Sequence, residues 1–218
     1  RLCRLPMATH RVSASLCWLV ALLAAPASPL HASPLKALDR RRALGVIAAP
    51  IAAPLAAPRP ARAAAGNRVV AADGSFAFVA PETFNAKPKP VKTHLDEVIY
   101  KDENRREIGV VVDRVKLDRL VDFGSPAFVG DKVVASERNR DGVTSATLRN
   151  ARQVDVAGET YFELAYENES SRGNNQFLSR IAVRDGRLFI MTLKARVDDA
   201  DAAAILGAVA ASFQVPAS

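Results

Sequence analysis

The chain has 218 residues and a formal net charge of +7, but this charge is unevenly distributed. Residues 1–65 hold nine of the 30 Lys and Arg residues and only one of the 23 Asp and Glu residues, so residues 66–218 are close to neutral. Both cysteines also lie before residue 66, so the remaining chain cannot form a disulfide, a cysteine zinc site or a thiol nucleophile. Its bulk charge also gives no support for nucleic-acid binding.

Residues 40–65 contain the three parts of an export signal, namely a basic start, an apolar run and a small-residue cleavage site. The residues that define this twin-arginine pattern are Arg40, Arg41, Arg42, Ala63 and Ala65. A second signal-like stretch covers residues 7–32, and Met7 is a candidate start of translation, although the chain could also be a fragment. We therefore predict a bipartite targeting presequence over residues 1–65 and one domain over residues 66–218.

The first half of that domain is predicted to be rich in strands. Residues 66–74 are polar and bounded by glycines, and are interpreted as a short lead-in before the first strand. The large-small alternation of residues 75–79 predicts a strand, and the prolines and lysines of residues 87–92 indicate an extended loop. Further strands are expected over residues 96–101 and 107–115, the second because of its β-branched residues.

A helix is expected to begin at Ser125-Pro126, since serine is a good N-cap and proline suits the first helical position. Strands are predicted near residues 144–156 and 160–167, and two more should flank Asp185-Gly186, a strong hairpin signal. A final helix should follow Asp198, Asp199 and Asp201, whose carboxylates can cap its N-terminus. This order predicts an α+β fold in which a central antiparallel β-sheet is flanked by helices.

The domain resembles the PsbP family, the extrinsic luminal proteins of photosynthetic membranes. The resemblance covers about residues 73–215 and depends on the order of several short motifs. These are Gly74-Ser75-Phe76-Ala77-Phe78, Asp122-Phe123-Gly124-Ser125-Pro126, Tyr161-Phe162-Glu163-Leu164, Phe177-Leu178-Ser179, Asp185-Gly186-Arg187-Leu188-Phe189 and Ser212-Phe213-Gln214-Val215. It implies an α-β-α sandwich, no enzymatic activity and a place in the thylakoid lumen.

Two departures from the family pattern suggest a PsbP-like or PsbP-domain protein, and not the oxygen-evolving subunit itself. The extension before the first expected strand is short, and Phe84 stands where the family often has tryptophan. Residues 7–32 are interpreted either as an ER-type signal, which we favour because of their compact apolar run, or as part of a plastid transit peptide. An ER-type signal would imply a plastid bounded by extra membranes.

Basic side chains are the candidates for docking to an acidic surface of a membrane complex. They form one group in the proline-containing loop and another between the first helix and the following strand; the alternative role for both is surface solubility. The candidates are Lys87, Lys89, Lys92, Arg138, Arg140, Arg149 and Arg152.

Candidates for metal binding and for acid–base chemistry are weaker. His94, the only histidine after residue 65, is expected to be a lone surface side chain, although Asp96 and Glu97 lie near it in sequence. Asp198, Asp199 and Asp201 could supply oxygens to Ca²⁺, but helix capping accounts for them. Glu163 and Glu167 share one face of a strand, where they could pair for general acid–base work but are more simply a solvated face.

Together these features predict a non-enzymatic, peripheral protein of the thylakoid lumen. It would bind photosystem II or another thylakoid complex and aid its assembly, stability or repair. No cofactor is expected, and Ca²⁺ is implied only by the family resemblance. The alternative is a small-molecule hydrolase or ligand-binding domain that uses His94, Glu163 or Glu167 as acid or base.

Overall fold

The computed structural model describes residues 66–88 and 94–216, so the predicted presequence and its targeting residues lie outside the described residues. The domain contains nine strands, a short 3-10 helix and two α-helices within these ranges. The strands are β1 (Gly66–Val70), β2 (Ala77–Pro81), β3 (Asn85–Lys87), β4 (Asp96–Lys101), β5 (Glu107–Arg114), β6 (Val143–Val156), β7 (Glu159–Ser170), β8 (Asn175–Arg184) and β9 (Arg187–Arg196). The helices are η1 (Leu120–Phe123), α2 (Pro126–Arg138) and α3 (Ala202–Ser212).

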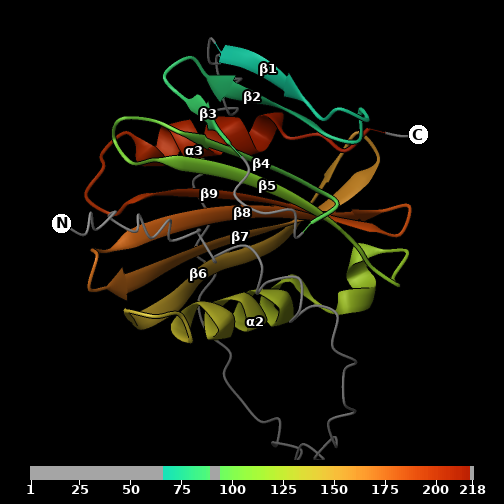
Figure 1. The fold of residues 1–218 in the computed structure, drawn as a ribbon. Helices are drawn as coiled ribbons and strands as arrows, with labels where there is room; N and C mark the ends of the chain where they lie inside the picture. Colours follow the sequence, from blue (N-terminus) through green and yellow to red (C-terminus); the bar gives the residue numbers. More distant parts are fainter. Residues whose placement is uncertain (1–65, 89–93, 217–218) are drawn as a thin grey trace, which may run out of the picture. The chain divides into compact units, whose positions relative to one another are not determined.

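Seven strands form one antiparallel sheet in the order β3-β4-β5-β9-β8-β7-β6, while β1 and β2 pair separately. The chain leaves β5 near the middle of this sheet, passes through η1 and α2, and re-enters at the edge strand β6 (Figure 1). Each of the strands β6 to β9 then pairs antiparallel with the next strand in the chain, and β9 also pairs with β5. The predicted α+β fold with a central antiparallel sheet is confirmed.

Helix α2 covers β6 and β7 on one face of the sheet. The cause is the two-residue period of β7, in which Phe162, Leu164 and Tyr166 all point to the same side. These side chains join Val129 and Val133 of α2 in a buried cluster. The alternation of residues 160–167 predicted that these three β7 side chains share one face of the strand.

The opposite face of the sheet packs against α3, which also contacts β2 of the smaller sheet. Its apolar stripe contributes Leu206 and Val209, and Phe213 follows directly after the helix. Phe213 is fully buried among aromatic rings, with its centroid 6.3 Å from Phe76 and 6.2 Å from Tyr161. One sheet therefore has a separate apolar cluster on each face.

The turn between β8 and β9 forms at Asp185-Gly186, as predicted. Both residues have a positive φ, 51° and 65°, which is the backbone conformation that a tight two-residue hairpin turn requires. The turn pairs Arg184 with Arg187 and so fixes the register along the whole hairpin. As a result Asn175 and Arg196 become neighbours at the far end.

Helix α2 begins where the sequence indicates. The Ser125 side chain accepts a hydrogen bond from the backbone nitrogen of Phe128 at 3.2 Å, with Pro126 in the first helical position. Replacing Ser125 with alanine should lower the free energy of unfolding by about 1 kcal/mol, because a backbone donor loses its acceptor. Urea unfolding would measure the change, and Ser125→Asp should retain most of the stability because aspartate also caps. Equal losses in the two variants would contradict a capping role.

Three local predictions were wrong. Residues 66–70 are not a lead-in before the first strand but form β1 themselves, because they pair with β2, and a short segment cannot reveal such a partner. The strand predicted over residues 75–79 begins and ends two residues later, as β2. Asp201 occupies the N-cap position of α3 without a capping side-chain hydrogen bond; Asp199 Oδ1 instead accepts a hydrogen bond from the backbone nitrogen of Asp201 at 3.2 Å.

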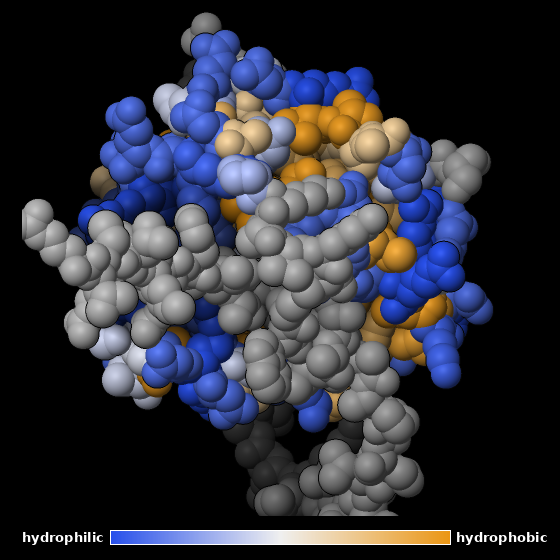
Figure 2. Space-filling model, in the orientation of Figure 1, coloured by the Kyte–Doolittle hydropathy of each residue, from blue (hydrophilic) through white to orange (hydrophobic). Residues whose placement is uncertain are grey.

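The exposed large apolar side chains of the described ranges are scattered over different elements. They are Val70, Leu95, Val121, Phe128 and Val197. On the face drawn in Figure 2, hydrophilic residues cover much of the coloured surface and hydrophobic colour gathers in a few places. None of the helices within the described residues combines the length and the apolar character needed to cross a lipid bilayer.

Candidate functional site

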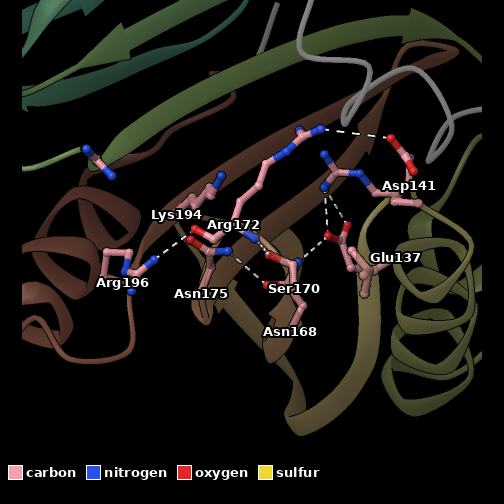
Figure 3. A pocket seen from close by; sticks show the side chains of 11 residues that line it. Glu137, Asp141, Asn168, Ser170, Arg172, Asn175, Lys194 and Arg196 are labelled. Carbon is pink, nitrogen blue, oxygen red and sulfur yellow. Dashed lines mark hydrogen bonds and ion pairs between the residues drawn. The ribbon is translucent and has the colours of Figure 1, made fainter.

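A polar cavity of about 150 Å³ lies where the ends of β7, β8 and β9 meet the C-terminal end of α2 (Figure 3). It is on the α2 side of the sheet, because Lys194 in its wall stands opposite Phe177 of the α2-side cluster. Cationic side chains dominate its lining. They are Arg105, Arg140, Arg172, Lys194 and Arg196, against two acidic residues, Glu137 and Asp141.

The floor of this basic pocket is a hydrogen-bonded chain of buried polar groups. Asn175 Nδ2 donates to Asn168 Oδ1 at 3.0 Å, and Asn168 Nδ2 donates to Glu137 Oε1 at 2.6 Å. Arg140 Nη1 donates to both carboxylate oxygens of Glu137, at 2.7 and 2.9 Å. Since buried polar groups are costly unless they are paired, this chain fixes the floor. It also neutralises the one buried acid of the pocket.

Lys194 stands in the wall of the pocket, on the same face of the sheet as its cross-strand neighbour Glu107, whose carboxylate lies 2.7 Å from Lys101 Nζ. Burial lowers the pKa of its ammonium group, and the carboxylate of Glu107 only partly opposes that effect. Lys194 makes no hydrogen bond or ion pair with another residue of the described ranges, and no dashed line meets it in Figure 3. A partly desolvated cation without an acceptor favours the approach of an anion.

The other cations of the pocket are only partly engaged. Arg196 Nη1 donates to the backbone oxygen of Arg172 at 3.1 Å, and Arg172 Nη2 lies 3.9 Å from Asp141 Oδ2. The Arg172 and Asp141 side chains are 68% and 96% exposed, so this pair forms part of the solvent-facing rim. Exposed pairs of this kind are weak and can exchange partners. The arrangement can therefore bind a negatively charged group.

The structure divides the predicted docking arginines between two places. Arg140 lines the basic pocket, whereas neighbouring Arg138 donates from Nε to the backbone oxygen of Ala146 at 2.9 Å. Arg149 and Arg152 belong to the other face of the sheet, where they pair with Glu167 and Glu163. These docking candidates therefore fall into two separate groups, one at the C-terminal end of α2 and one on β6. The exposed Lys87 ends β3, and Lys89 and Lys92 lie outside the described residues.

The two candidate carboxylates of β7 are occupied by arginines. Glu163 accepts two hydrogen bonds from Arg152, at 2.6 and 2.8 Å, and its other oxygen lies 3.4 Å from Nε of buried Arg180. Arg180 in turn lies over the Tyr161 ring and donates to the backbone oxygen of Ala210 in α3. The expectation that Glu163 lies on a solvated face was wrong, since it joins the sheet to α3.

His94 is not the lone surface side chain that the sequence suggested. Its Nδ1 lies 2.5 Å from Asp113 Oδ2, and its side chain is only 5% exposed. Asp113 is on the α2 side of the sheet, opposite Leu188, whereas Glu163 is on the α3 side. The acid–base set of the alternative hydrolase is therefore not brought together. Within the ranges that the structure describes, no three His, Cys, Asp or Glu side chains converge as a metal site.

Asp199, one of the aspartates before α3, binds a buried arginine, which the sequence did not indicate. Asp199 accepts hydrogen bonds from Nε and Nη2 of buried Arg106, at 2.5 and 2.8 Å. These bonds lower the pKa of Asp199 below its ordinary value. Asp198 instead lies 3.4 Å from Arg196 Nε, at the outer side of the basic pocket. The three residues thus do not form one oxygen cluster.

Most residues of the basic pocket were missed by the sequence analysis. One signal was available, because the Asp185-Gly186 turn sets the register that places Lys194 opposite Phe177 and Arg196 opposite Asn175. That register predicts a basic end of the hairpin. It does not predict that the end of α2 and the turn containing Arg105 approach the same point, since those contacts are long-range.

A family model described as PsbP matches residues 66–215, well over half of the chain. The chain belongs to the PsbP family. Along 127 residues it is 26% identical to PsbP domain-containing protein 2, chloroplastic, of Arabidopsis thaliana, over 58% of this chain. The matched stretch is 54% of that relative, so the chain spans about half of the relative's length.

Comparison with solved structures identifies the same fold. The solution structure of cyanobacterial PsbP (CyanoP) from Synechocystis sp. PCC 6803 matches with a TM-score of 0.60. The match covers 75% of this chain and 100% of that one, with 20% identity. A likeness at that identity establishes the architecture alone, and the PsbP family match confirms the resemblance found in the sequence.

Proposed function

We propose that this PsbP-family protein is a non-enzymatic, peripheral protein of the thylakoid lumen that binds a thylakoid membrane complex, with photosystem II as the first candidate. Binding would aid the assembly, stability or repair of that complex. The observation that carries the proposal is the basic pocket, whose five cationic side chains face two acidic ones on a PsbP fold. A cationic concavity suits reversible docking to an acidic protein surface.

The proposed location draws on two independent facts. The Arabidopsis relative is named as chloroplastic, and residues 40–65 of this chain have the pattern of a twin-arginine signal. Removal of residues 1–65 would leave a domain with almost no net charge, so its interactions would depend on local patches. We propose that the domain acts without a resident cofactor, and that dependence on Ca²⁺ would be a property of the assembled complex.

The test is release of the protein from isolated thylakoids. We expect the protein to co-purify with a photosystem II subunit from gently solubilised thylakoids at low salt and to be lost from the membranes during a wash near 1 M NaCl, where the Debye length is about 3 Å. Immunoblotting of the wash and the pellet measures both outcomes. Retention at high salt, or a soluble pool with no co-purifying membrane subunit, would contradict the proposal.

A further inference from the structure

The buried polar groups on the floor of the basic pocket are hydrogen-bonded, whereas two cationic side chains of its lining lack an acceptor among the described residues. Glu137, Asn168 and Asn175 hydrogen-bond to one another or to Arg140, so the buried polar groups of the floor need no added ligand. Lys194 and Arg105 line the same cavity, and neither side chain has a hydrogen bond or ion pair with another residue that the structure describes. The missing element is therefore an acceptor for these two cations.

The size of the cavity limits that acceptor. A volume of about 150 Å³ matches that of a known internal cavity that binds one benzene molecule. This space accommodates one small oxyanion group with a few carbon atoms, such as the end of a glutamate side chain.

The charge distribution favours a carboxylate. Arg140 neutralises Glu137, the acid at the cavity floor, and Lys194 is the partly buried ammonium group of the lining. One carboxylate brings a single negative charge and two acceptor oxygens, which can serve Lys194 and a guanidinium together. A phosphate monoester would bring nearly two charges into a space with one desolvated cation.

The rim of the pocket indicates a protein source for this group. Arg172 and Asp141 are largely exposed and carry opposite charges, so the rim can discriminate the residues that flank an entering side chain. The pocket also lies at the ends of strands, open to a partner surface. We propose that the basic pocket receives one carboxylate side chain from an acidic segment of the partner protein, with Lys194 as its main contact. This inference depends on the proposed function, because it assigns part of the docking surface.

The experiment uses the ¹⁵N-labelled full chain and three probes added separately: an acetyl-tetraglutamate amide peptide, inorganic phosphate, and phosphatidylglycerol vesicles. We expect the peptide to shift the side-chain amide signals of Asn168 and Asn175 and the backbone signals of residues 140–143. Lys194→Met should weaken peptide binding by about 10-fold or more, because a charge-assisted hydrogen bond is lost. Arg105→Gln, in an exposed turn, should weaken it by a smaller factor.

The matched control is Arg119→Gln, which removes the same charge beyond the N-terminal end of α2. Because α2 has 13 residues, that end is about 20 Å from the pocket. Arg119→Gln should leave the affinity within about two-fold, since only screened bulk charge changes. The amide spectrum of each variant shows whether it is folded; if Lys194→Met were unfolded, Arg105→Gln would decide the result.

Several outcomes would overturn the inference. These are equal weakening by Lys194→Met and Arg119→Gln, peptide shifts that map elsewhere, displacement of the peptide by millimolar phosphate, or binding to the vesicles only. The thylakoid release assay separates this inference from the proposed function. If Lys194→Met still co-purifies normally with the membrane complex, the pocket assignment is wrong but the function stands. If the pocket binds the peptide but the protein never associates with thylakoids, the function is wrong and the carboxylate site remains.

Discussion

Replacing Phe213 with alanine should lower the free energy of unfolding by about 3–5 kcal/mol, the largest loss that we expect from one substitution. Phe213 is fully buried and contacts the rings of Phe76, just before β2, and Tyr161, in β7. Alanine would leave a cavity between α3, the smaller sheet and the main sheet. Because ordinary domains are stable by only about 5–15 kcal/mol, the variant should unfold at a much lower urea concentration.

Phe128→Ala is the control for this experiment. Phe128 is 41% exposed on the first turn of α2, so its removal creates no internal cavity. We expect a loss of less than about 1 kcal/mol, typical of a surface position. Similar urea midpoints for the two variants would show that Phe213 does not hold α3 on the sheet.

Replacing Arg106 with glutamine should be almost as damaging, with an expected loss of about 3–5 kcal/mol at neutral pH. The guanidinium bonds Asp199 through two nitrogens and lies 3.4 Å from Asp102, so it joins the β4–β5 turn to the segment before α3. The Arg106 side chain is 9% exposed and that of Asp102 only 2%. Without Arg106, two poorly solvated carboxylates would face each other without a cation.

The pH dependence of this variant gives a sharper test than its stability alone. Hydrogen bonds from Arg106 lower the pKa of Asp199 in the folded protein. A carboxyl group with a lowered folded pKa contributes stability above its unfolded pKa, near 3.9, and loses this contribution as the pH falls through the folded value. The wild-type protein should therefore lose stability on acidification more steeply than Arg106→Gln.

Urea unfolding at several pH values from about 7 down to about 3 would show the gap between the two proteins narrowing in acid. Arg119→Gln, which breaks the exposed pair with Asp122, should leave the urea midpoint unchanged at every pH. Parallel curves for wild type and Arg106→Gln would mean that the Arg106–Asp199 pair does not set the acid sensitivity.

Local patterns predicted the elements of this fold where neighbours in sequence decide the conformation. Ser125-Pro126 starts α2 and Asp185-Gly186 turns between β8 and β9, because capping and turn conformations involve a few adjacent residues. The alternation of residues 160–167 assigned both faces of β7. Strand β1 was missed because its stability depends on β2, and two valines in five residues are a weak local signal for a strand.

The candidate site was less predictable, since its contacts connect distant parts of the chain. Asp113 pairs with His94 from the next strand, and Asp199 pairs with Arg106 across 93 positions. Of the predicted docking residues that the structure describes, only Arg140 lines the basic pocket. Lys194 sits in a β-strand whose neighbours are apolar, and nothing in sequence marks it as the cation that faces the end of α2.

The two-sided use of β7 has a consequence for folding errors. Phe162 and Leu164 lie beneath α2, while Glu163 and Glu167 alternate with them toward the opposite side. A slip of one residue would place two carboxylates in the apolar layer beneath α2 and two large apolar side chains beside the arginines of the opposite face, and would separate Glu163 from Arg152 and Arg180. The shifted register should therefore be much less stable than the native one. The alternation that places Glu163 and Glu167 beside the arginines of β6, on the opposite face from the pocket, thus also favours the correct pairing of the strands.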